Sequence, residues 1–129
     1  MHTAVNITAA AILLAHGLAH LVGFVGPWRL NPRVPYKTTI LAGRIDLGNL
    51  GSKIVGLLWL LLAIDFALVA WGASAGAAWW PLAAVATALI SLVLCLLAWP
   101  DSMLGAFVNI GIVVIIVIWR VGLGFFQRS

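Results

Sequence analysis

Four stretches of the chain are apolar over about 20 residues each, the length that a helix needs to cross the hydrocarbon core of a membrane. They cover residues 3–26, 51–71, 79–99 and 102–123. Every tryptophan except Trp59 falls near the end of a stretch, where interfacial aromatic residues concentrate in membrane proteins. The sequence therefore predicts an all-α fold, a transmembrane four-helix bundle that forms a single membrane domain over residues 1–129.

Composition excludes several classes of protein. Hydrophobic residues make up 64% of the chain and charged residues only 8%, whereas soluble domains carry about 25% charged residues. We therefore exclude an ordinary soluble domain, a disordered chain and a nucleic-acid-binding protein. The chain has seven basic and three acidic residues, and five of the seven basic residues lie in or beside the segment 27–50. By the positive-inside rule this segment is expected in the cytoplasm and both termini outside.

The segment 27–50 connects the first two spans and contains more than linker residues. Residues 36–41 are rich in β-formers, residues 42–43 can turn, and residues 44–47 can return, which indicates a small β-hairpin on the membrane surface. An irregular loop and a short extra helix remain alternatives. If the segment acts as a lid or docking element, its candidate residues are Tyr36, Arg44, Asp46 and Asn49.

Polar residues inside the predicted spans are the candidates for function, because ionisable groups at this depth are expensive and face a bundle interior or a wet cavity. His20 and Asn109 are expected about 10 Å from the loop side at the helical rise, and Ser91 about 12 Å. His16 follows at about 16 Å and Asp65 at about 21 Å. These five residues describe a polar column that enters the bundle from the loop side.

Several chemistries fit this column. His16 and His20, four residues apart, could bind a metal with Asp65 as third ligand, or one of them could bind haem. The zinc-protease motif is excluded because Gly17 stands where its glutamate is required. His16 and Asp65 could also form a proton-handling pair, and the column could hold the polar end of an amphipathic ligand. The alternative is purely structural hydrogen bonding between helices.

The stripe Thr87, Ser91 and Cys95 on the third span recurs every four residues, so its members share one helix face. Small residues such as Gly17 and Ala84 accompany the polar positions, and membrane helices pack closely through such residues. We interpret the stripe mainly as a packing surface. The small-residue faces also make a homodimer or a larger membrane complex an expected partner arrangement.

Several short runs resemble a known group of proteins. They are HGLAHLVGF at 16–24, WRL at 28–30, YKTTILAGR at 36–44, GLLWL at 56–60 and WPD at 99–101. Together they resemble a family of small four-span bacterial integral membrane proteins without an established activity, some of which are labelled permeases. In topology and size alone the chain is more distantly similar to DoxX-like proteins. The resemblance implies a bacterial cytoplasmic membrane and supplies no catalytic residues.

The sequence thus favours a small non-enzymatic membrane protein. It would bind a hydrophobic or amphipathic ligand, or a partner subunit, through the polar column and the loop. One alternative is an intramembrane enzyme or redox accessory that uses His16, His20 and Asp65 with a metal or haem. Another is a proton-coupled transporter that acts as an oligomer. The lipid bilayer is the expected surrounding, and no nucleic acid is expected.

Overall fold

The structure is a computed structural model and describes residues 2–126 of the chain. Within these residues it contains five helices and one two-stranded sheet. The helices are α1 (His2–Ala19), α2 (Leu21–Val25), α3 (Gly48–Ser74), α4 (Trp80–Leu97) and α5 (Met103–Phe126). The strands are β1 (Thr39–Ile40) and β2 (Ile45–Asp46).

Four segments of the described residues are long and apolar enough to cross a membrane, with α1 and α2 together forming the first. The predicted all-α four-helix bundle is confirmed. The main difference lies in α3, which begins at Gly48 and ends at Ser74, three residues beyond the predicted span at either end. At its start the Gly48 N–H donates to the Asp46 carboxylate at 2.9 Å, so a side-chain contact begins the helix before the apolar residues do.

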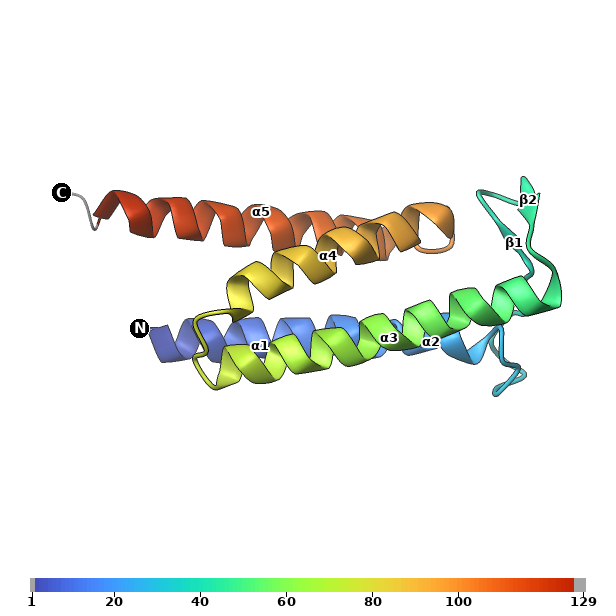
Figure 1. The fold of residues 1–129 in the computed structure, drawn as a ribbon, viewed down its shortest axis with the longest axis horizontal. Coiled ribbons are helices and arrows are strands. Elements are labelled where there is room, and N and C mark those ends of the chain that lie inside the picture. The colour runs from blue at the N-terminus through green and yellow to red at the C-terminus, as the bar shows by residue number, and fades with distance from the viewer. Residues whose placement is uncertain (1, 127–129) are drawn as a thin grey trace.

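The helices form two antiparallel pairs (Figure 1). The first pair is α1–α2 against α3, the second is α4 against α5, and α3 also packs on α4. Figure 1 shows both termini at one end of the bundle and the two strands at the other. The long connecting segment therefore lies at one end of the bundle, and the short turn between α3 and α4 lies at the other.

Small residues allow the first pair to pack closely. Gly17 lies so near α3 that an added Cβ would stand 2.7 Å from the Cβ of Phe66 and 3.2 Å from the Ala63 carbonyl oxygen. Gly23 presses on the ring of Trp59 in the same way. Such close backbone approach is how membrane helices gain dispersion contacts where lipid supplies no hydrophobic drive.

The connecting segment forms the expected hairpin, although each strand is only two residues long. Thr39 pairs with Asp46 and Ile40 with Ile45. The turn donates backbone N–H groups to the carbonyl end of α4, from Leu41 to Leu97 at 2.7 Å and from Ala42 to Trp99 at 3.0 Å. These bonds hold Leu41 and Ala42 at positive φ and supply partners for carbonyls that a helix end leaves unpaired.

An ion pair between Lys37 and Asp101 adds a side-chain contact between the segment and the α4–α5 turn. The segment starts from α2 and ends in α3, so its contacts with α4 and the following turn link the two helix pairs. It forms a cover over one end of the bundle.

The packing at Gly17 gives a direct prediction. Gly17→Ala forces its new methyl group against the backbone and Phe66 of α3, and overpacking of this kind costs about 1–3 kcal/mol of unfolding free energy. Gly111→Ala on α5 is the matched control, because a Cβ there meets nothing within 4 Å. Reversible unfolding in mixed micelles measures both, and equal stabilities of the two variants would contradict the packing described.

Candidate functional site: a hydrogen-bonded ring inside the bundle

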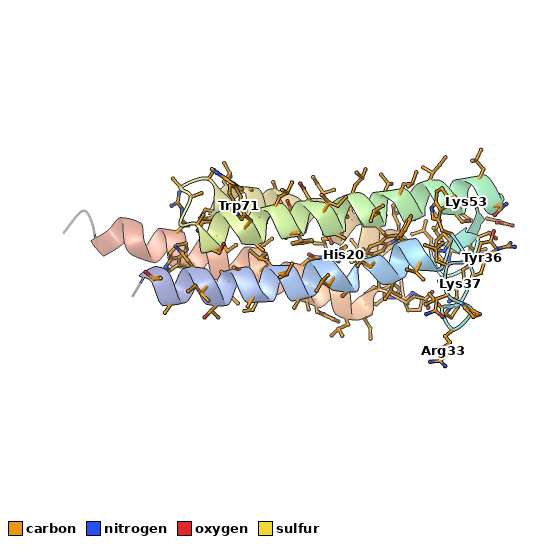
Figure 2. All side chains as sticks on the ribbon, turned by 90° about the horizontal axis from the view of Figure 1, so that it is seen from below. His20, Arg33, Tyr36, Lys37, Lys53 and Trp71 are labelled. Atoms are coloured by element: carbon orange, nitrogen blue, oxygen red, sulfur yellow. The ribbon has the colours of Figure 1, made fainter. Side chains whose placement is uncertain are left out.

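The first span tightens where its two histidines lie. The backbone N–H of His20 bonds to the carbonyl of Gly17 at 3.1 Å, and that of Gly23 bonds to the carbonyl of His20 at 3.0 Å. These contacts span three residues instead of four, so α1 ends at Ala19 and α2 begins at Leu21. Both His16 and His20 are buried, and Figure 2 shows His20 between the two ends of the bundle.

Four hydrogen bonds connect the two histidines with Asn109 and Ser91, and two of the four cross from the first helix pair to the second. The His16 Nε2 atom lies 3.0 Å from Asn109 Oδ1 on α5, and Asn109 Nδ2 lies 2.8 Å from Ser91 Oγ on α4. Ser91 Oγ lies 2.7 Å from His20 Nε2, and His20 Nδ1 lies 2.9 Å from the His16 carbonyl oxygen. Because the last bond returns to His16, the four bonds close a ring, which we call the polar ring.

The donor and acceptor of each bond in the polar ring can be assigned in turn, starting from the His16 carbonyl oxygen. The His16 carbonyl can only accept, so His20 Nδ1 donates to it. A neutral imidazole has one donor and one acceptor, and charge is disfavoured inside a membrane bundle, so His20 Nε2 accepts from the Ser91 hydroxyl. Ser91 then accepts from the Asn109 amide, and Asn109 Oδ1 accepts from His16 Nε2–H. All four bonds run in the same sense around the ring.

This direction leaves one unused atom. In neutral His16 the Nε2 atom carries the proton, so Nδ1 is an acceptor. Among the described residues no group donates to it. In the described part of the chain, every fully buried side-chain nitrogen or oxygen has a hydrogen-bond partner. Because His16 Nδ1 has no partner, it is not fully buried and retains accessible surface. The polar ring is complete and presents a single free acceptor.

Aromatic side chains of α3 form the wall behind the histidines. Phe66 is fully buried, and its ring centroid lies 4.9 Å from that of His16 and 5.2 Å from that of His20. The Trp59 ring lies 5.1 Å from that of His20, and the two imidazoles meet edge to face at 4.7 Å. These contacts fix the imidazole planes, so the hydrogen-bond geometry is held by packing as well.

The stripe on α4 is divided between two settings. Ser91 belongs to the polar ring, and Cys95 receives a longer contact of 3.6 Å from Asn109 Nδ2. Thr87 instead donates to Asp65 Oδ2 at 3.1 Å. All three are buried, as expected for a packing surface, but Ser91 also joins the group of candidate site residues.

Asp65 does not join the other members of the expected column. Asp65 lies at the predicted depth, since its neighbour Phe66 contacts His16, but its own side chain is exposed at the bundle surface beside α4. Within the described residues no group of three or more His, Cys, Asp or Glu side chains could hold a metal. The three-ligand metal set and the His16–Asp65 pair considered from the sequence are therefore not assembled in this structure.

The loop candidates fall into two places, and Figure 2 shows Tyr36 among the basic side chains at the loop end of the bundle. The Tyr36 hydroxyl donates to Asn49 Oδ1 at 2.7 Å, and the Arg29 guanidinium lies 4.1 Å from the centre of the Tyr36 ring. Asp46 accepts from Gly48 at the start of α3, and Arg44 is exposed at the hairpin turn. Tyr36 and Asn49 therefore form one contact, while Asp46 has a structural role.

A cavity of about 1150 Å³ connects the polar ring with the loop end. Both histidines, Trp59 and Cys95 contribute to its wall in the bundle. The hairpin contributes from the other end, together with apolar residues of the spans and of the α4–α5 turn. The cavity is partly open and mostly apolar, and its polar lining comes from the histidines, the loop, Ser52 and the α4–α5 turn.

Three contributors to this site were missed from the sequence. Trp59 and Phe66 form the aromatic wall, and Arg29 packs on Tyr36. Trp59 did carry a signal, because it alone among the tryptophans lies away from a span end. Phe66 carried none, since a phenylalanine in an apolar span resembles its neighbours.

No family model, no curated protein and no solved structure matches the chain. The class of the protein therefore follows from the fold and the site alone. Four apolar helices suited to a bilayer enclose a buried His–Asn–Ser cluster, and they define an α-helical integral membrane protein. The resemblance to small four-span bacterial proteins remains an expectation from the short runs.

Tyr36 offers a test of the loop contacts by pH. Two interactions lower the pKa of Tyr36 from its ordinary value of 10.0. The larger is hydrogen bonding with the Ser52 hydroxyl, and the next is the Arg29 guanidinium. Tyr36 is the only tyrosine, so tyrosinate absorbance in a pH titration reports on it alone. We expect a midpoint below 10.0 that rises in Arg29→Gln and is unchanged in Arg33→Gln. A wild-type midpoint at or above 10.0 would refute this arrangement.

Proposed function

We propose that this membrane protein binds an amphipathic small molecule or lipid in the cavity beneath the loop, and that the polar end of the ligand donates a hydrogen bond to His16. The observation that carries the proposal is the free Nδ1 acceptor of His16, a residue in the cavity wall. The proposed role is binding rather than catalysis.

The cavity has the character of a small-molecule site. Such sites enclose about 300–1,000 Å³, are mostly apolar, and contain a few polar groups that orient the ligand. The volume here is about 1150 Å³, and Trp59 and Cys95 lie close to the two imidazoles in its wall. The hairpin beside it is anchored by its bonds to Leu97 and Trp99, so it can serve as a fixed cover.

The polar ring defines the chemistry of the ligand. Its other side-chain donors and acceptors already have partners, so a ligand that competes for them would break an existing bond inside the bundle. His16 Nδ1 can be used without such a loss, and it accepts. The preferred ligand therefore carries a hydroxyl or N–H group on an apolar body.

The alternative functions have less support from the contacts. Both ring nitrogens of His20 are engaged, and metal or haem ligation by His20 would require the loss of one of these bonds. Phe66, the next residue after Asp65, is the one that contacts His16, and the Asp65 carboxyl bonds to Thr87 instead. A proton path that uses both residues would need a different rotation of α3.

The distribution of charge supports an orientation in the membrane. Five of the seven Lys and Arg residues lie in the loop or near the start of α3, and Figure 2 shows Arg33, Lys37 and Lys53 at that end. Cytoplasmic segments carry an excess of Lys and Arg. We therefore place the loop and the cavity mouth on the cytoplasmic side.

The proposal can be tested with two probes that differ by one donor. Hexadecan-1-ol has a hydroxyl hydrogen, and hexadecyl methyl ether lacks it. Native mass spectrometry of the purified protein measures the binding of each probe. We expect the alcohol to bind about fivefold more tightly, because a net hydrogen bond contributes about 1 kcal/mol.

Two variants control for binding elsewhere on the apolar surface. Ala19 lines the cavity and Leu18 does not, although both are exposed. Ala19→Phe should fill part of the cavity and weaken the binding of both probes, whereas Leu18→Phe should leave binding unchanged. Equal affinity for the two probes would show that the ligand does not donate a hydrogen bond to His16. Binding that is absent, or that Ala19→Phe leaves unchanged, would overturn the proposal.

A further inference from the structure

Asp65 places an exposed carboxyl group at a depth where lipid would surround a single copy of the protein. Along α3 it stands about 26 Å from the Gly48 end and about 14 Å from the Ser74 end at the helical rise. A hydrocarbon core is about 30 Å thick, so Asp65 lies well inside it. Its side chain is nevertheless exposed on the outer surface of the bundle.

The hydrogen bonds of Asp65 are only partly satisfied. Thr87 donates to Oδ2 at 3.1 Å. In the part of the chain that the structure describes, no group bonds to Oδ1 and no basic side chain pairs with the carboxyl. Ionisable residues within spans normally pair or face a cavity, and the described residues supply no such pairing for this carboxyl.

The surface around Asp65 is apolar and permits close approach. Leu61 and Leu68, one turn to either side on α3, are 60% and 55% exposed. On α4, Ala86 is exposed beside Thr87, and Ala83 is half-buried one turn away. Small alanine side chains allow another helix to come near the backbone, and interhelical hydrogen bonds often accompany such contacts.

We propose that the partner is a second copy of this chain, which packs its α3–α4 face on the first across a two-fold axis along the membrane normal. This symmetry keeps every residue at its own depth, so the two Asp65 carboxyls meet at the same level. A protonated carboxyl both donates and accepts, and two of them can bond to each other in hydrocarbon. Each also keeps its bond from Thr87.

The basic residues of the spans cannot pair with Asp65 of another copy, because they lie at other depths. Lys53 lies about 18 Å from Asp65 along α3 at the helical rise, at the loop end. Arg120 lies six residues before the end of α5, and Figure 1 shows that α5 ends on the side opposite the hairpin. Neither reaches the depth of Asp65 in a parallel dimer, whereas the second Asp65 does so by symmetry.

Energy transfer between labelled copies in liposomes measures the association over a range of protein-to-lipid ratios. We expect a dimer for the wild type and for Asp65→Asn, which retains a donor and an acceptor. Asp65→Leu should weaken association about tenfold, because the hydrogen bonds between the copies are lost. Ile115→Ala on α5, at a position that is 69% exposed, is the control and should associate as the wild type does.

Cysteine cross-linking locates the contact without removing Asp65. Leu61→Cys and Leu68→Cys should each cross-link between copies, whereas Ile118→Cys on α5 should not. The native Cys95 is 1% exposed and will not compete. A monomeric wild type, an unchanged affinity in Asp65→Leu, or cross-linking only through position 118 would overturn the proposal. Disruption of the amphipathic-ligand site would leave these results unaffected.

Discussion

The polar ring is the interaction on which the arrangement of the two helix pairs depends. Inside a bilayer no water is available, so each polar group must find its partner within the protein. His16 and His20 on the first span find theirs in Asn109 and Ser91 on the second pair. Apolar packing is not directional, whereas these bonds are satisfied only at one rotation and one depth of each helix. They therefore select one packing among several that are similarly apolar.

The same ring relates structure to the proposed function. Because its four bonds run in one sense, His16 is left with a free acceptor at Nδ1, whereas the other polar side-chain atoms of the ring already have partners. Phe66 and Trp59 hold the imidazole planes from behind. The ring thus stabilises the bundle, and in the proposed function it would also provide a preorganised contact for a ligand without the loss of any of its bonds.

The sequence predicted the spans, the hairpin and the identity of most polar residues, because hydropathy, turn residues and rare polar positions are local signals. It did not predict the rotation of α3. That helix is apolar on all sides, with Leu61 exposed and Leu62 buried, so neither hydropathy nor spacing distinguishes its inner face. As a result Phe66 rather than Asp65 faces the histidines, although the depth expected for Asp65 was close to that of His16. The start of α3 was missed because the Asp46–Gly48 contact, and not hydropathy, begins the helix.

The most direct test of the polar ring is nitrogen NMR of the protein with ¹⁵N-labelled histidine in lipid bilayers. His16→Gln and His20→Gln assign the signals, and His2→Gln removes the third histidine from the spectrum. The ring predicts two neutral imidazoles in opposite tautomers, with the proton on Nε2 in His16 and on Nδ1 in His20. The same tautomer in both residues, or a charged imidazole at neutral pH, would contradict the ring and the free acceptor that follows from it.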